Sequence, residues 1–116
     1  MNIKEAEKLT GISKRNIRFY EQKGMLHPAR NQDNDYRDYS SQDIERLKLI
    51  RALRMVDSPL EEVQKVLDGK TSLEDAATAQ ERQLRERVQE VQTAIRFCKS
   101  LQGLRGDVEV DAILRE

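Results

Sequence analysis

Residues 2–24, which read NIKEAEKLTGISKRNIRFYEQKG, contain the clearest structural pattern of the chain. It contains two helix starts, because Asn2 is followed three residues later by Glu5, as in a capping box, and Ser13 can cap a second helix over 14–23. A glycine follows each helix, where a positive φ ends it. Two short helices joined at TGIS form either a helix-turn-helix or a simple αα-hairpin, and the spacing alone leaves both open.

Apolar residues at helical spacing support the same two helices. Ile3, Ala6 and Leu9 recur every three residues and are expected to face the core from the first helix. Ile17 and Tyr20 are expected to point inward from the second. The two helices are therefore predicted to pack through these faces.

Residues 27–40, which read HPARNQDNDYRDYS, break the helical period. Asn, Asp and Pro favour turns, and they crowd this segment. It is predicted to form a short β-hairpin with its turn near 33–35, and with Tyr36, Arg37 and Tyr39 on the second strand.

Two more helices are predicted after the hairpin. Ser40, with an aspartate three residues later, opens a third helix over 41–56. Ser58 as the cap and Pro59 at the first helical position indicate a fourth helix that runs to Leu67. The apolar residues at intervals of three and four in these helices are Ile44, Leu47, Ile50 and Leu53 or Arg54, then Leu60, Val63 and Leu67.

A long helix is predicted over 72–102, which contains no Gly or Pro. Its apolar residues follow a heptad pattern, which is typical of a coiled coil. Such a seam is too narrow to form a globular core alone and needs a partner helix. The domains expected are 1–68, 72–102 and a short tail over 103–116. The seam residues are Leu84, Val88, Val91, Ile95 and Cys98.

The charge balance hides a bias. Charged residues make up 36% of the chain, and 21 Lys or Arg balance 21 Asp or Glu, which is typical of helices joined by side-chain ion pairs. Residues 1–54, however, carry 12 basic and 8 acidic side chains. The N-terminal part is therefore the candidate surface for an anionic partner.

The composition excludes several classes of protein. One cysteine and one histidine cannot supply an ordinary zinc centre, so no metal site is expected. A single cysteine forms no disulfide framework within the chain and points to a reducing compartment, so a cytoplasmic location is expected. Five scattered glycines leave no phosphate-binding loop, and no catalytic constellation or cofactor motif is present, so an enzyme is not expected. No apolar run approaches the length of a membrane span.

Cationic side chains gather at the start of the second helix. Lys14, Arg15 and Arg18 share one side of it, with Asn16 nearby. Cations at a helix N-terminus oppose the helix dipole, so a solvated basic helix end is the less favoured interpretation. Arginine can pair bidentately with guanine and lysine can bind phosphate, so this group favours a contact with DNA.

Two further groups extend this candidate interface. Tyr36 and Arg37 on the hairpin can bind a phosphate or lie in a minor groove. The alternative is that the hairpin tyrosines only pack it onto the helices, which is expected for Tyr39 more than for Tyr36. Arg51 and Arg54 either contact DNA or are ordinary cations favoured by the dipole at a helix C-terminus, and the sequence leaves both open.

Three stretches, taken in order, carry a resemblance to a known family. They read RNIRFYEQKGML at 15–26, NDYRDYSSQDIERLKLIRALR at 34–54 and SPLEEVQKVL at 58–67. They contain R-x-Y-E-x-x-G, YR-x-Y-S and LEEV, which are weak alone and specific together. Residues 2–68 thus resemble the DNA-binding domain of the MerR family of bacterial transcription regulators, and 72–102 stands where that family keeps its dimerisation helix.

The resemblance implies a mainly α fold, with a winged helix-turn-helix head whose wing is 27–40, followed by an antiparallel coiled coil between two subunits. It implies a homodimer that binds a pseudo-palindromic promoter spacer and distorts it so that RNA polymerase can engage both promoter elements. Distortion of DNA costs energy, which phosphate contacts from the wings can offset. Carried over by position, the DNA contacts are Lys14, Arg15, Arg18 and Tyr20 in the second helix, Tyr36 and Arg37 in the wing, and Arg54 in a second wing.

Two positions depart from the family pattern. The wing turn, usually Asn-Gly, is Asn34-Asp35 here, which favours another turn type because Asp tolerates a positive φ less well than Gly. In the second wing, Asp57-Ser58-Pro59 replaces a glycine followed by an aromatic residue. A carboxylate there repels phosphates, which argues against DNA contacts by Arg54.

Members of the family sense metals, oxidants or drugs at and beyond the end of the coil. The metal-sensing pattern of two or more cysteines beyond the coil is absent here. Cys98 is expected to pack in the seam as a small apolar residue rather than to act as a redox sensor. In an antiparallel coil centred near Val88, the two Cys98 residues would lie roughly 30 Å apart, so a disulfide across the dimer axis is not expected.

Two other functions fit the residues. An architectural or excisionase-like protein also binds DNA through a winged helix, although such factors often lack a dimerisation helix. A protein-interaction adaptor would use the coil as its binding surface. A footprint confined to one promoter spacer separates the regulator from the first alternative, and loss of DNA affinity in Arg18→Ala separates it from the second.

Overall fold

The computed structural model of the protein describes residues 1–31, 33–34, 36–104 and 107–115, without the side chains of 107–109. The chain forms two compact units, the N-terminal unit Met1–Gln80 and the C-terminal unit Glu81–Glu116. Each unit is described by itself below.

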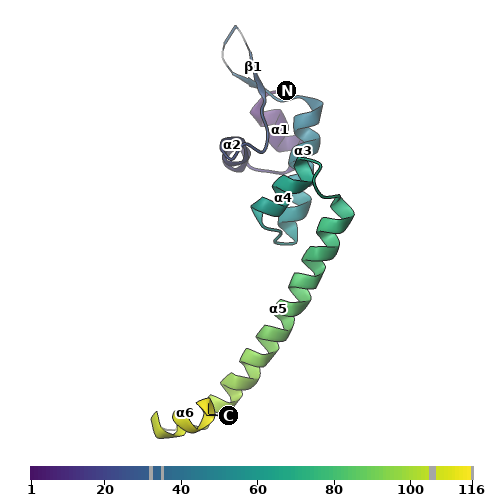
Figure 1. The fold of residues 1–116 in the computed structure, drawn as a ribbon. Helices are drawn as coiled ribbons and strands as arrows, with labels where there is room; N and C mark the ends of the chain where they lie inside the picture. The colour runs from purple at the N-terminus through teal and green to yellow at the C-terminus, as the bar shows by residue number, and fades with distance from the viewer. Residues whose placement is uncertain (32, 35, 105–106, 116) are drawn as a thin grey trace. The chain divides into compact units, whose positions relative to one another are not determined.

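The N-terminal unit is built around one central helix (Figure 1). Helix α3 packs against both α1 and α4, and α1 also packs against α2. The elements of this unit are α1 (Ile3–Thr10), α2 (Lys14–Gln22), β1 (Ala29–Arg30), β2 (Arg37–Asp38), α3 (Ser41–Met55), α4 (Leu60–Leu67) and the start of α5 (Leu73–Leu101).

Three of the predicted helix caps are confirmed. Asn2 Oδ1 accepts a hydrogen bond from the backbone N–H of Glu5 at 2.8 Å. The Glu5 carboxylate accepts the backbone N–H of Asn2 in return, which completes the capping box. Ser13 Oγ accepts from the backbone of Asn16 at 3.2 Å, and Ser40 closes a full capping box at the start of α3. These caps depend on residues three positions apart, so the sequence alone contains them.

The predicted cap of α4 is wrong by one residue. Pro59, not Ser58, is the N-cap, no side chain caps this helix, and α4 begins at Leu60. The reason is the preceding turn, where Asp57 adopts a left-handed φ of 61° and the backbone N–H of Ser58 bonds to Leu53 O at 3.0 Å. Ser58 is thereby drawn inside the turn and buried.

One apolar core fills the N-terminal unit. The predicted inward residues of α3 are confirmed, and the open choice falls on Leu53, which is 2% exposed, whereas Arg54 is exposed. The prediction for Leu9 is wrong, since it is 54% exposed, and Thr10 is buried in its place. Thr10 lies one full turn after Ala6 and satisfies its hydroxyl by donating to Ala6 O at 2.8 Å. The largest fully buried side chains are Tyr39, Ile17, Met25, Leu26, Leu47, Ile50 and Val63.

Two arginines of α3 tie the helices together. Arg46 donates to Met25 O at 2.7 and 2.9 Å and to Leu67 O at 3.2 Å. Arg51 Nη1 donates to Thr10 O at 2.7 Å and so caps the end of α1. Neither interpretation left open for Arg51 included this contact, in which its guanidinium holds α1 to α3.

The wing is an antiparallel hairpin in which Ala29 pairs with Asp38 and Arg30 pairs with Arg37. The backbone N–H of Asn31 bonds to Tyr36 O at 2.6 Å and extends the pairing toward the tip. The predicted wing is therefore confirmed as a short hairpin, with only two residues in each strand. The turn is predicted near 33–35, and within this range Asp35 lies outside the residues that the structure describes.

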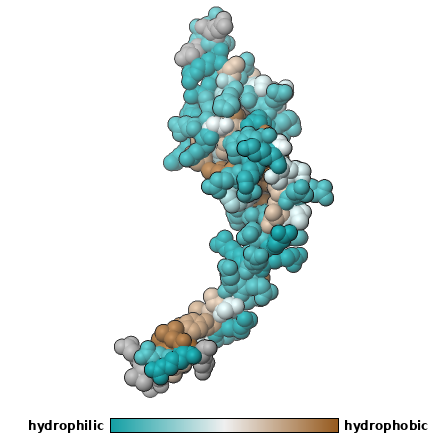
Figure 2. All heavy atoms as spheres, viewed as in Figure 1, coloured by the Kyte–Doolittle hydropathy of each residue, from teal (hydrophilic) through white to brown (hydrophobic). Residues whose placement is uncertain are grey.

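The C-terminal unit contains the rest of α5 and α6 (Asp107–Leu114). The central residues of the predicted seam are exposed to solvent on α5, where Val88, Val91 and Ile95 are 52%, 50% and 51% exposed. The other two seam positions are Leu84, which is half-buried, and Cys98, which is exposed. Figure 2 shows apolar residues gathered over the end of α5 and over α6. Helix α6 falls in the segment that the sequence indicated only as a tail.

None of the helices in the described parts of the chain combines the length and the apolarity of a bilayer span.

Candidate nucleic-acid interface

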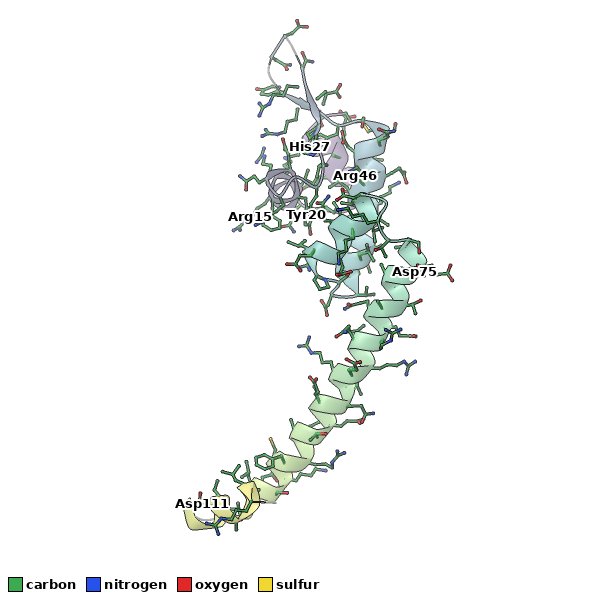
Figure 3. All side chains as sticks on the ribbon, viewed as in Figure 1. Arg15, Tyr20, His27, Arg46, Asp75 and Asp111 are labelled. Carbon is green, nitrogen blue, oxygen red and sulfur yellow. The ribbon has the colours of Figure 1, made fainter. Side chains whose placement is uncertain are left out.

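The exposed side of α2 is cationic. A helix advances about 100° per residue, which places Lys14, Arg15 and Arg18 within one arc of about 100°. Arg15 and Arg18 are exposed and Lys14 is half-buried, whereas Ile17, about 160° around the helix from Arg15, is 0% exposed. In Figure 3, Arg15 lies on the side of α2 that is away from α3, and Tyr20 lies on the side nearer to it. The structure therefore brings the three predicted cations together on one solvent-facing surface.

Asn16 is exposed as well, but it lies a further 100° or so around α2 from Arg15. Phe19 is a residue of the exposed side that the sequence analysis did not select. It is 38% exposed, and the Lys23 ammonium lies 5.5 Å from its ring centroid. Its ring widens the surface beside Arg15, one turn further along the helix.

The N-terminus of α2 is supported by an acidic side chain from α1. Glu7 Oε2 accepts the backbone N–H of Lys14 at 2.9 Å. A carboxylate at a helix N-terminus interacts favourably with the dipole, which offsets the unfavourable cations in the same turn. The sequence analysis missed Glu7, because the contact crosses the turn between two helices and leaves no local pattern.

Tyr20 is only partly available to a ligand. Its side chain is half-buried against the core, and its ring meets that of Phe19 edge-on with centroids 5.5 Å apart. Of the predicted contacts on α2, Tyr20 is thus the one most engaged in packing.

The two tyrosines that flank β2 differ in burial, as the sequence predicts. Tyr36 is 73% exposed and Tyr39 is 1% exposed. The Tyr39 backbone N–H bonds to Met1 O at 2.7 Å, which ties the base of the wing to the start of the chain. Burial, and secondarily the Glu21 carboxylate, raises the pKa of Tyr39 above its ordinary value, so this hydroxyl stays protonated at neutral pH.

Arg37 binds back onto α2. Its Nε lies 2.7 Å from Glu21 Oε1 and 2.6 Å from Glu21 Oε2, and both side chains are largely shielded from solvent. Arg37 is therefore engaged with the protein at the junction of the wing and α2. Glu21 stands in the motif R-x-Y-E-x-x-G, yet its charge gave no sequence signal for a contact 16 residues away.

The predicted second wing is the turn between α3 and α4. Arg54 is exposed, and its Nη1 donates to Ser58 O at 2.9 Å, so this guanidinium stabilises the turn. Asp57 is exposed in the same turn, and Gln80 Nε2 from α5 donates to Val56 O at 2.8 Å. An acidic residue beside Arg54 weakens the attraction of this turn for phosphates.

Among the residues that the structure describes, no group of three His, Cys, Asp or Glu side chains is arranged to hold a metal ion.

Two short helices with a cationic second helix, followed by a β-hairpin and α3, define a winged helix-turn-helix protein of the DNA-binding class. The sequence model of the MerR HTH family regulatory proteins matches residues 1–70. The chain belongs to this family.

Relatives and solved structures agree with this assignment. The chain is 32% identical to the HTH-type transcriptional regulator CueR of Escherichia coli O157:H7 over 93% of its length and 78% of that protein. It is 37% identical to heavy metal-dependent transcription regulator 2 of Rhizobium meliloti over 58% of its length and 46% of that protein. The structure of PbrR691 from Ralstonia metallidurans, solved with lead(II), covers 94% of this chain and 93% of its own, with a TM-score of 0.73 and 25% identity.

Family membership confirms the central sequence prediction. MerR proteins are transcription regulators and not enzymes, so the prediction that this chain is not an enzyme is confirmed as well. The individual DNA contacts and the seam contacts on α5 stay predictions.

Proposed function

We propose that this DNA-binding transcription regulator acts as a homodimer on a two-fold symmetric promoter spacer, with one α2 and one wing from each chain on each half-site. The family binds promoter DNA and acts as dimers. The observation that carries the proposal for this chain is the solvent-facing cationic surface of α2, next to a wing that carries Arg30, Tyr36 and Arg37.

The α2 surface has the composition that sequence readout requires. Arg15 and Arg18 supply guanidinium groups for guanine edges or phosphates. Asn16, which lies beyond Arg15 at the edge of this surface, supplies an amide for adenine. The exposed Tyr36 hydroxyl on the wing contacts the sugar-phosphate backbone beside the groove. Lys14, whose backbone is fixed by Glu7, adds a phosphate contact at the first turn of the helix.

Dimerisation assigns a role to the exposed seam of α5. Leu84, Val88, Val91, Ile95 and Cys98 of one chain pack against the same positions of a second, antiparallel copy. A helix with an unpaired apolar stripe gains stability from such a partner, since burial of each half-exposed Val or Ile contributes about 1 kcal/mol. The dimer then supplies two heads, one for each half-site of the duplex.

The dimer distorts the spacer between the two promoter elements, and RNA polymerase then engages both. Contacts from α2, the wing and, more weakly, Arg54 offset the energy of bending and untwisting the DNA. The protein acts in the bacterial cytoplasm, where the chromosome lies.

The test is the affinity of Arg18→Ala for a duplex enriched from a random pool by the wild-type protein, measured by gel shift at a stated salt concentration. We expect binding to weaken by about 1–3 kcal/mol, or roughly 5- to 150-fold, because a guanidinium contact is lost.

Arg82→Ala is the matched control, because it removes the same charge from an exposed position of α5 outside the seam. It is expected to change affinity less than two-fold or so. Equal affinity of Arg18→Ala and wild type would contradict the proposed interface.

A further inference from the structure

Glu21 is an acidic residue in a place where DNA binding disfavours one. It lies three residues after Arg18 and seven after Lys14, so all three share one side of α2. A carboxylate at that position repels the phosphates that the neighbouring cations attract. Its presence therefore needs a reason that outweighs this cost.

The reason lies in the contact between Glu21 and the wing. Arg37 Nε carries one hydrogen and donates it to Glu21 Oε1 at 2.7 Å, while Oε2 lies 2.6 Å from the same nitrogen. The side chains of Arg37 and Glu21 are 34% and 19% exposed, so salt screens this ion pair less than it screens a surface pair. This bond joins β2 directly to α2.

The pairing of the wing strands makes the same carboxylate useful in a second way. Arg30 lies directly opposite Arg37 in the hairpin, and opposed residues of antiparallel strands share one face. Like charges in that arrangement repel each other. Through its ion pair with Arg37, Glu21 supplies an opposite charge beside β2, which favours the attachment of the hairpin to α2.

The buried Tyr39 ring completes the junction. Burial, Glu21 and Asp43 raise its pKa, whereas Arg37 and Arg18 lower it, so these four charged groups all lie within electrostatic reach of the Tyr39 hydroxyl. The junction contains a charged cluster rather than a single surface ion pair.

We propose that Glu21 is a positioning residue for DNA binding, which holds Arg37 and thereby fixes the wing at one distance from the contact surface of α2. This inference rests on the proposed function. A fixed wing meets the backbone beside the groove without losing the conformational freedom of a mobile hairpin, which favours binding. Arg37 then acts mainly through Glu21, and Tyr36 and Arg30 are the wing residues that reach the phosphates.

The test exploits two effects of opposite sign. Removal of a negative charge beside DNA strengthens binding, whereas loss of a fixed wing weakens it. We expect Glu21→Ala to weaken binding to the selected duplex about five-fold or more, as for a broken coupled pair. Glu21→Gln keeps the shape of the side chain and the fold, and is expected to weaken binding in the same direction by a smaller factor. Glu45→Ala, which removes an exposed carboxylate of α3, is the control for charge alone and is expected to leave affinity equal or slightly higher.

The double-mutant cycle shows whether Glu21 acts through Arg37. In the Arg37→Ala background, Glu21→Ala is expected to leave affinity unchanged or to raise it. The positioning role is overturned if Glu21→Ala and Glu21→Gln tighten binding in the wild-type background, or if Glu21→Ala weakens binding equally in both backgrounds. Arg18→Ala distinguishes a failure of the positioning role from a failure of the proposed DNA interface. If it weakens binding while the Glu21 variants do not, only the positioning role is wrong, and if it leaves binding unchanged, the DNA interface is wrong and the positioning role with it.

Discussion

The two units of the molecule treat the same kinds of side chain differently. In the N-terminal unit Ile17, Leu47 and Val63 are 0% exposed, whereas in the C-terminal unit Val88 and Ile95 are 52% and 51% exposed. Both sets recur at helical spacing in the sequence. The first is buried by the helices of its own chain, whereas about half of each side chain of the second set is exposed to solvent.

The N-terminal unit buries its apolar residues within one chain, whereas the C-terminal unit does not. Three or more helices packed at angles enclose a core, which a single straight helix cannot do. A 3.5-residue repeat makes a seam that another helix fills. The head is therefore expected to fold within one chain, whereas the coil is expected to need two.

The largest effect is expected from a charge placed in the seam. Val91→Glu puts a carboxylate where the antiparallel partner packs, twice in each dimer, and burial of an unpaired charge is strongly unfavourable. We expect dimer dissociation to become at least about 100-fold easier, or roughly 3 kcal/mol, measured by sedimentation across a dilution series.

Gln89→Glu is the control for this variant, since it adds the same charge two residues away on an exposed side of α5. It is expected to leave the dimer intact. A dimer unchanged by Val91→Glu would show that the exposed seam is not the surface that dimerises.

A smaller effect is expected inside the head, at Gly11. Both Gly11, with φ 73°, and Gly24, with φ 75°, are left-handed, but a Cβ at Gly11 collides with the Arg51 guanidinium and one at Gly24 has open space. Gly24→Ala is expected to cost about 1 kcal/mol for the backbone alone. Gly11→Ala is expected to cost about 1 kcal/mol more, because Arg51 must leave Thr10 O.

Thermal unfolding of the two alanine variants measures this difference as a gap of about 4 °C between their midpoints. A gap of this size would show that the stability of the head depends on contacts between its own helices. Equal midpoints would show that Arg51 does not hold α1 to α3.

The sequence predicted the features that depend on neighbours in the chain. The caps at Asn2, Ser13 and Ser40 use partners three residues away, and the turn-forming residues indicated the hairpin. The expectation that Tyr39 packs on the helices more than Tyr36 is confirmed by their burial.

The features that the sequence did not predict depend on contacts between elements. Leu9 and Thr10 exchanged roles because the neighbouring helices decide which side of α1 is covered. Glu7 and Glu21 look like ordinary surface charges until α2 and the wing are placed beside them. Arg51 was one of several cations at the end of a helix, and only the packing of α1 on α3 gave it a partner.

The most direct test of the central claim is the sequence of the duplexes that the wild-type chain selects from a random pool. Two heads held by paired α5 helices predict an inverted repeat, with half-sites separated in register with the helical repeat of DNA and with two chains bound to each duplex. Enrichment of a single asymmetric site with one chain bound, or no enrichment at all, would contradict the account.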